Sequence, residues 1–201
     1  MTEALEFLIK KDKVLKQIYD DLGSPYIPNR PEGFDTLCKL IIEQQVSLES
    51  AKACFKNLEA NIGNITPENI LKHSIETLRT FSISKQKASY LVALSNAVIE
   101  KTLNIEKLSF FNDDEIREQL IKVKGIGNWT IDIYLMFCLN SKDIIPIGDI
   151  AVVNTIKELY NCNTKEEIIQ VSEIWKPNRS MATYLLWHYY LAKRNRKPII
   201  Y

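Results

Sequence analysis

The sequence has almost no net charge, because 26 lysines and arginines are balanced by 25 aspartates and glutamates, which leaves +1 at neutral pH. Bulk charge therefore does not demand a nucleic acid as partner, and any phosphate-binding surface must come from local placement of basic residues. No apolar run approaches the roughly 20 residues that span a bilayer. The polar start, with Glu3 and Glu6, does not resemble a signal peptide. We expect neither secretion nor membrane insertion.

Metal-binding and disulfide-forming residues are also scarce. His73 and His188 are isolated, and no group of histidines, cysteines and carboxylates has the spacing of a transition-metal site. The four cysteines lie far apart in apolar, helix-like stretches: Cys38, Cys54, Cys138 and Cys162. We expect buried thiols in a reducing cytosol, no disulfide and no metal centre of this kind.

Sustained strand alternation is missing as well; the apolar stretch 144–147 is interrupted by Pro146. Helical spacing of apolar residues is common instead, and it predicts an all-α fold. A chain of 201 residues can form one domain or two small ones. The longer helices are expected at about 2–22, 34–45, 47–62, 84–101, 112–123, 128–138 and 179–194.

Two of these helices, together covering about 114–138, are separated by Gly125-Ile126-Gly127, which has room only for a tight hairpin. Glycines permit positive φ and close backbone approach, and we expect Gly127 to need this freedom. A hairpin that ends at a helix N-terminus points unpaired N–H groups outward, which suits phosphate. Such a glycine pair alone is usually an ordinary turn. Here Asp149 opens a further helix some twenty residues later, which makes the pattern more specific.

Four stretches of the sequence, in order, resemble the helix-hairpin-helix DNA glycosylases, and within them the 3-methyladenine DNA glycosylase II family: 43–47, 82–88, 122–153 and 175–180. The resemblance covers roughly residues 35 to 190. It implies two helical subdomains with a DNA-binding cleft between them. One subdomain would run from about 35–130, and the other would combine about 1–34 with 131–201.

The resemblance implies a monofunctional glycosylase that flips out alkylated purines, hydrolyses the N-glycosidic bond and leaves an abasic site. Asp149 falls on the family's catalytic aspartate. An isolated Asp before a helix is usually an N-cap, and both roles can hold together. A carboxylate stabilises the oxocarbenium character that the sugar gains as the base leaves. Asp149 could also orient or deprotonate the attacking water.

The same resemblance implies that Trp129 and Trp187 line the base pocket, although core packing is the ordinary role of such residues. An indole face attracts cationic alkylated purines more than normal bases. Relatives with lyase activity carry a lysine at the position of Trp129, and tryptophan cannot form a Schiff base. A further pocket tyrosine of the family is replaced by Ile133 here, so Tyr134 beside it becomes the candidate.

The family's wedge, which fills the gap left by a flipped base, matches Gln45, with Gln44 beside it; two surface glutamines are the alternative. Lys85 is a candidate phosphate contact and Lys87 a packing residue. A basic tail from 193 to 197 could add charge. The other expected DNA contacts lie at the hairpin: Lys122, Lys124, Gly125, Gly127 and Thr130.

Cofactors and partners follow from the same resemblance. Folds of this kind commonly hold a monovalent cation, Na⁺ or K⁺, and the resemblance implies such a site at the carbonyls of Val123 and Ile126. An iron–sulfur cluster is not expected, because Cys162 is the single cysteine beyond residue 138. The expected partner is double-stranded DNA with damaged bases, bound by a monomer in the cytoplasm, at the nucleoid, or in a eukaryotic nucleus.

Three alternatives stay open. The same fold could act on deaminated purines or other damaged bases, and the sequence does not rank the alkylated ones. A non-catalytic helix-hairpin-helix module would only grip phosphates, but it would need neither Asp149 nor the two tryptophans. A structural helical protein unrelated to DNA would make four ordered matches a coincidence.

Overall fold

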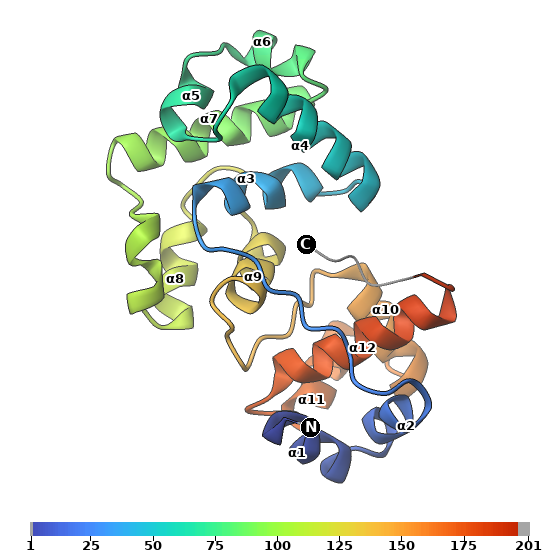
Figure 1. Ribbon diagram of the computed structural model, residues 1–201. Coiled ribbons are helices and arrows are strands. Elements are labelled where there is room, and N and C mark those ends of the chain that lie inside the picture. Colours follow the sequence, from blue (N-terminus) through green and yellow to red (C-terminus); the bar gives the residue numbers. More distant parts are fainter. Residues whose placement is uncertain (1, 197–201) are drawn as a thin grey trace. The chain divides into compact units, whose positions relative to one another are not determined.

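The computed structural model describes residues 2–196, and within this range every regular element is helical (Figure 1). The all-α prediction is therefore confirmed. The elements are α1 (Glu3–Lys11), α2 (Lys13–Leu22), α3 (Phe34–Glu43), α4 (Leu48–Ile62), α5 (Pro67–Leu71), α6 (Ile75–Thr80), α7 (Lys85–Ile99), η1 (Ile105–Phe110, a 3₁₀ helix), α8 (Asp113–Leu120), α9 (Asn128–Phe137), α10 (Ile150–Tyr160), α11 (Lys165–Glu173) and α12 (Arg179–Lys193).

The chain divides into two compact units. Of the described residues, those up to Arg30 and from Leu135 onward form the terminal unit, and Pro31–Tyr134 form the central unit. The boundaries expected from the sequence, after residues 34 and 130, each differ by four residues from the observed ones. The second boundary falls inside α9, so one helix contributes to both units.

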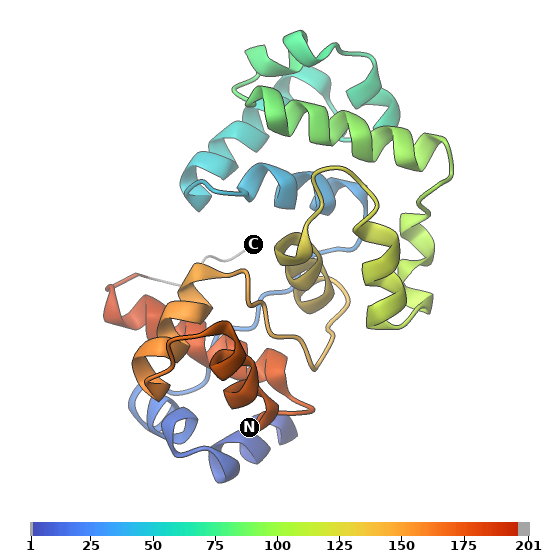
Figure 2. The same cartoon turned by 180° about the vertical axis from the view of Figure 1, so that it is seen from behind.

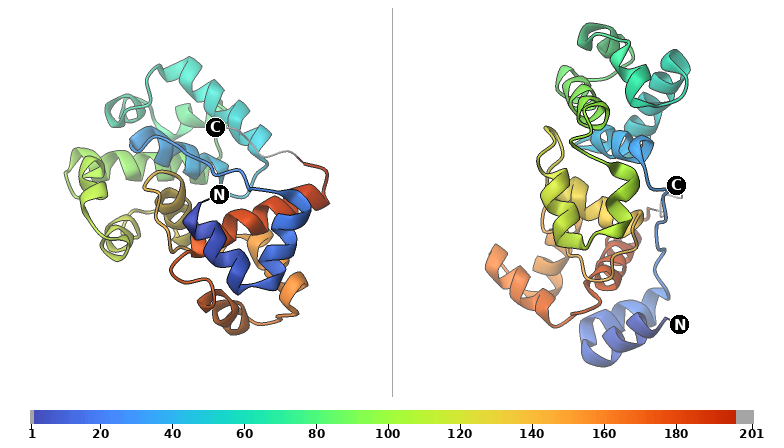
Figure 3. Two further views of the ribbon diagram at one scale, coloured as in Figure 1. Left: turned by 60° about the horizontal axis from the view of Figure 1, so that its bottom comes forward. Right: turned by 90° about the vertical axis from the view of Figure 1, so that its left-hand side faces the viewer.

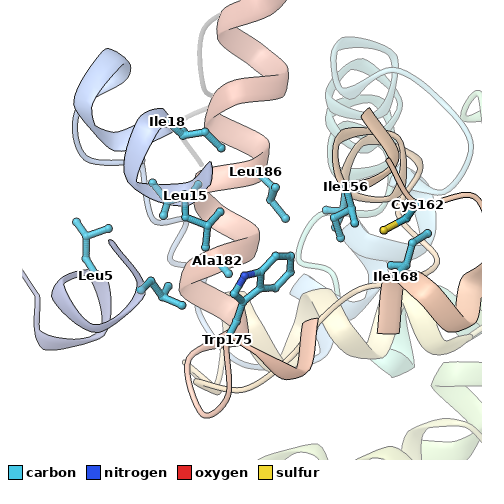
Figure 4. Packing of buried hydrophobic residues seen from close by; sticks show 12 residues of the cluster. Leu5, Leu15, Ile18, Ile156, Cys162, Ile168, Trp175, Ala182 and Leu186 are labelled. Carbon is cyan, nitrogen blue, oxygen red and sulfur yellow. The ribbon is translucent and has the colours of Figure 1, made fainter. Parts of the chain in front are cut away.

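The terminal unit is built around α12, which packs against α2 and α10, while α1 packs on α2 and α11 on α10 (Figure 3, left). Trp175, fully buried, lies between Ala182 and Leu186 of α12 on one side and Ile156 and Ile168 on the other (Figure 4). Each large aliphatic side chain that is fully buried in this core contributes about 1.5–3 kcal/mol to the free energy of folding. Val152 and Ile156 of α10 belong to this core, which therefore fixes the position of α10 and of Asp149, the residue that precedes it.

A buried carboxylate ties the first two helices to this core. Asp12 Oδ1 accepts the amides of Val14 and Leu15 at 2.8 and 3.1 Å, so Asp12 caps α2. Its Oδ2 accepts Trp175 Nε1–H and the Tyr160 hydroxyl, both at 2.8 Å. Burial, followed by the charge of Asp12, raises the pKa of Tyr160. The single helix expected over 2–22 is therefore wrong, because Asp12 ends one helix and starts another.

In the central unit, α5 and α6 pack on α7, and α3 packs on α4 and α7 (Figure 2). Local signals locate the helix starts. Asn112 and Glu115 form a capping box at the start of α8, and Thr66 caps α5 ahead of Pro67. Such caps satisfy amides that have no partner within the helix. The terminal unit repeats the capping box at Thr164, which caps α11.

The described residues contain no helix with the length and apolar character needed to cross a membrane. All four cysteines are free thiols, and burial raises the pKa of Cys38. Cys54 is partly exposed, so the expectation of a buried thiol is wrong at that position. Within 2–196, no group of three or more histidines, cysteines and carboxylates is arranged as a metal site.

Candidate functional site

Asp149 lies at the N-terminus of α10, where it is the N-cap expected from the sequence. Its Oδ1 accepts the Val152 amide at 3.0 Å and the indole N–H of Trp187 at 3.2 Å. Its own amide donates to the carbonyl of Pro146 at 2.9 Å, which closes the turn before the helix. The carboxylate is therefore held by one donor from its own helix and one from α12.

Trp187 is partly buried in the terminal unit, where its ring packs edge-on against Phe137 with centroids 5.7 Å apart. Tyr184 lies at 6.0 Å on the same helix. The family resemblance implies that Trp187 lines a base pocket. It did not indicate that the indole N–H of Trp187 orients Asp149. That contact joins residues 38 positions apart and depends on the packing of α10 on α12, which no local pattern reveals.

The hairpin between α8 and α9 requires glycine at Gly125. Its φ is +95°, and a Cβ built there would lie 2.1 Å from Cγ of Tyr90. Gly127 has no such constraint, because its φ lies outside the positive range and a Cβ would meet no atom within 4 Å. The expectation that Gly127 needs positive φ is therefore wrong, and Gly125 is the residue that does.

The two hairpin helices are also clamped by Arg117 of α8. Its guanidinium donates to Asp132 at 2.5 Å and to the side chain of Asn128 at 3.2 Å, both on α9. Burial raises the pKa of Asp132, an effect that Arg117 partly opposes. The exposed side chains of Lys122 and Lys124 lie on the segment between the helices. A rigid turn with two exposed cations and an exposed Gly127 is suited to contact phosphate.

Gln44 braces this hairpin from the end of α3. Its Nε2 donates to the carbonyl of Gly125 at 2.9 Å and to Oγ1 of Thr130 at 3.0 Å. Thr130 is 1% exposed, so the prediction that it contacts DNA is wrong. Gln44 was expected to contact DNA as well, but its amide group is committed to the hairpin. Gln44 and Thr130 therefore support the hairpin between α8 and α9 from within and set its geometry.

Gln45, in contrast, is exposed in the turn between α3 and α4, with φ +57°. A non-glycine residue in this left-handed region costs of order 1–3 kcal/mol and persists where neighbouring structure holds it. Here Lys87 caps the end of α3 by donating to the carbonyl of Ile42 at 2.7 Å, and burial lowers the pKa of Lys87. The packing role expected for Lys87 is thus observed; Lys85 is exposed.

The other sequence candidates are placed as follows. Tyr134 is fully buried and its hydroxyl accepts the Gly33 amide at 3.2 Å, so its predicted place in a base pocket is wrong: no surface is left for a base. Trp129 is partly buried on the first turn of α9. In the basic tail, Lys193 pairs with Glu158, and Lys197 lies outside the described residues.

Comparison with known proteins agrees with this arrangement. Residues 38–177 match the model of the HhH-GPD superfamily, a family of base excision DNA repair proteins. The match covers more than half of the chain. The protein therefore belongs to the HhH-GPD superfamily, which confirms the family expected from the sequence.

Particular relatives can be named. The chain is 29% identical to DNA-3-methyladenine glycosylase of Bacillus subtilis, covering 90% of this chain and 64% of that protein. It is also 29% identical to DNA-3-methyladenine glycosylase 1 of Schizosaccharomyces pombe, over 99% and 92% of the two chains. The solved structure of S. pombe 3-methyladenine DNA glycosylase (Mag1) with abasic DNA superposes with a TM-score of 0.83, at 28% identity, over 92% and 95% of the chains.

Proposed function

We propose that the protein is a base-excision-repair DNA glycosylase that removes alkylated purines of the 3-methyladenine type from duplex DNA. The observation that carries the proposal is Asp149, a helix-capping carboxylate oriented by both Val152 and Trp187. It occurs in a chain whose relatives are named DNA-3-methyladenine glycosylases. The protein would act as a monomer.

Asp149 would supply the charge that the reaction needs. Departure of the base leaves oxocarbenium character on the sugar. A carboxylate about 4 Å away stabilises that cation by roughly 4 kcal/mol at an effective dielectric constant of 20, which corresponds to about a thousandfold in rate. Because Val152 and Trp187 fix the carboxylate before substrate arrives, little reorganisation is needed during the reaction. The same group could orient the attacking water.

Trp129 would recognise the base and decide the reaction's outcome. Its indole face would attract the positive charge of an N3- or N7-alkylated purine. It stands where relatives with lyase activity carry a lysine, and an indole cannot form the Schiff base of the lyase reaction. The product would therefore be an intact strand with an abasic site.

DNA would be gripped by the central unit at two elements. The hairpin would offer the Gly127 amide, with Lys122 and Lys124, to phosphates. The turn at Gln45 would insert a side chain into the duplex while the base is flipped. Gln44 connects the two elements, so they would engage DNA as one body.

A monovalent cation would fit the hairpin. The Val123 carbonyl accepts the Ile126 amide at 3.0 Å, and a carbonyl oxygen keeps a second lone pair for a cation. The carbonyls of Val123 and Ile126 would hold Na⁺ or K⁺, which would add positive charge near a bound phosphate.

The proposal is tested by incubating the protein with duplexes carrying 3-methyladenine, 7-methylguanine, ethenoadenine or hypoxanthine. Abasic sites are then cleaved with alkali, and Asp149→Asn serves as the matched control. We expect release of at least one alkylated base by the parent protein. Release of hypoxanthine alone would identify a glycosylase for deaminated purines, and binding without any release would identify a non-catalytic module.

A further inference from the structure

The segment 138–149, which leads from α9 to Asp149, contains no helix, and its residues 141–144 are held by the first two residues of α12. Arg179 Nε and Nη2 donate to the two carboxylate oxygens of Asp143 at 2.8 and 3.0 Å. Nη2 also donates to the Asp143 carbonyl at 2.9 Å, and the Arg179 amide to Oδ1 at 3.3 Å. Such a two-pronged guanidinium–carboxylate pair fixes direction as well as distance.

Ser180, the next residue, holds the same segment through three further hydrogen bonds. Its hydroxyl donates to the Ser141 carbonyl at 2.6 Å and accepts the Ile144 amide at 3.0 Å. Its own amide donates to the Lys142 carbonyl at 3.0 Å. Because Ser180 is 3% exposed, water does not readily replace these bonds.

The other end of the segment is held by the same helix. Trp187 lies seven residues after Ser180, which places both on one face of α12, about 10 Å apart along its axis. Trp187 then contacts Asp149 itself. A single helix, α12, thus holds both residues 141–144 of the segment and the carboxylate at its end.

Building on the proposed glycosylase activity, we propose that Arg179 is a positioning residue that acts through Asp143 and the 141–149 segment to place the Asp149 carboxylate. The physical reason is geometric: a misplacement of 1 Å can cost about a hundredfold in rate. Without the guanidinium, the segment would lose its anchor at Asp143, so the backbone that carries Asp149 would be held less firmly.

The test compares Arg179→Ala, Arg179→Lys and Asp143→Asn with the parent by single-turnover excision at saturating enzyme. DNA affinity and thermal unfolding are measured on the same samples. We expect Arg179→Ala to lower the excision rate about tenfold to a hundredfold, and Arg179→Lys to retain part of the rate. DNA affinity should stay within about threefold. Lys16→Ala, which removes an exposed ion pair on α2, is the matched control and should keep the parent rate.

A second measurement separates positioning from general stability. If Arg179 acts through Asp149, adding Arg179→Ala to Asp149→Asn should cost less than about threefold, because the carboxylate being placed is already gone. Equal losses in both backgrounds would overturn the proposal. If Arg179→Ala unfolds at the assay temperature, the excision rates of Arg179→Lys and Ser180→Ala are compared in the same two backgrounds. Those rates then decide whether α12 acts through Asp149. A parent protein that releases no base refutes the proposed function; an active parent with a fully active Arg179→Ala refutes only the positioning role.

Discussion

The side-chain amide of Gln44 donates a hydrogen bond to the carbonyl of Gly125, 81 residues further along the chain, at 2.9 Å. It joins the turn that carries Gln45 to the helix-hairpin-helix, so two proposed DNA-contacting elements share one geometry. Gln44 supports these two elements, whereas Gln45 is exposed. The sequence alone could not tell which of the two glutamines has which role.

We predict that Gln44→Ala weakens DNA binding without removing a DNA contact. Two partly buried acceptors would lose their donor, at about 1–3 kcal/mol in the free energy of unfolding. Binding should weaken while the slope of log affinity against log salt stays unchanged, because no phosphate contact is lost. Urea unfolding and salt-dependent binding check this. Gln45→Ala is the control: it should lower excision with little change in stability. A reduced salt slope in Gln44→Ala would place Gln44 on the phosphates instead.

The two hairpin glycines, Gly125 and Gly127, should differ sharply in the stability that is lost when each is replaced by alanine. Gly125→Ala should destabilise the protein by at least about 2 kcal/mol, since positive φ alone costs a side chain 1–2 kcal/mol and Tyr90 occupies the space. Gly127→Ala should be nearly neutral in stability, and Gly127→Asp should keep its helical content but lose DNA binding by charge repulsion. Replacing Tyr90 by Ala in the Gly125→Ala background should restore part of the stability. Equal unfolding free energies for Gly125→Ala and Gly127→Ala would contradict this picture.

Trp187→Phe should lower excision about tenfold while leaving the fold intact. Phenylalanine keeps an aromatic ring beside Phe137 but removes the N–H that contacts Asp149, and a hydrogen bond to a charged group contributes about 1.5–3 kcal/mol. Single-turnover kinetics and thermal unfolding measure the two effects separately. A parent-like rate in Trp187→Phe would show that this hydrogen bond does not help to place the carboxylate.

No covalent adduct should form with DNA. Borohydride should fail to trap the protein on a damaged duplex, and strand breaks should appear only after alkali or an added endonuclease, because Trp129 offers no amine. A borohydride-trapped complex would show that an amine elsewhere in the chain has taken over the lyase role.

Helix starts were predictable because they depend on neighbouring residues, as at Thr66-Pro67 and in the capping box of Asn112 with Glu115. Contacts between distant residues were not. Asp12 falls inside the single helix expected over 2–22, yet it is the buried partner of Trp175, 163 residues away. Tyr134 was misplaced for another reason. It was chosen because it lies beside Ile133, which replaces the family's pocket tyrosine, but residues 130–138 are all buried, so standing next to that position gives no access to a base.

The most direct test of the account is the single-turnover excision rate of Asp149→Asn on a duplex carrying an alkylated purine. The asparagine side-chain oxygen can still accept the hydrogen bonds from Val152 and Trp187, so the cap is kept and only the charge is lost. We predict a rate at least about a hundredfold below the parent, with unchanged DNA affinity and helical content. A folded Asp149→Asn protein that excises the base at nearly the parent rate would contradict the central claim.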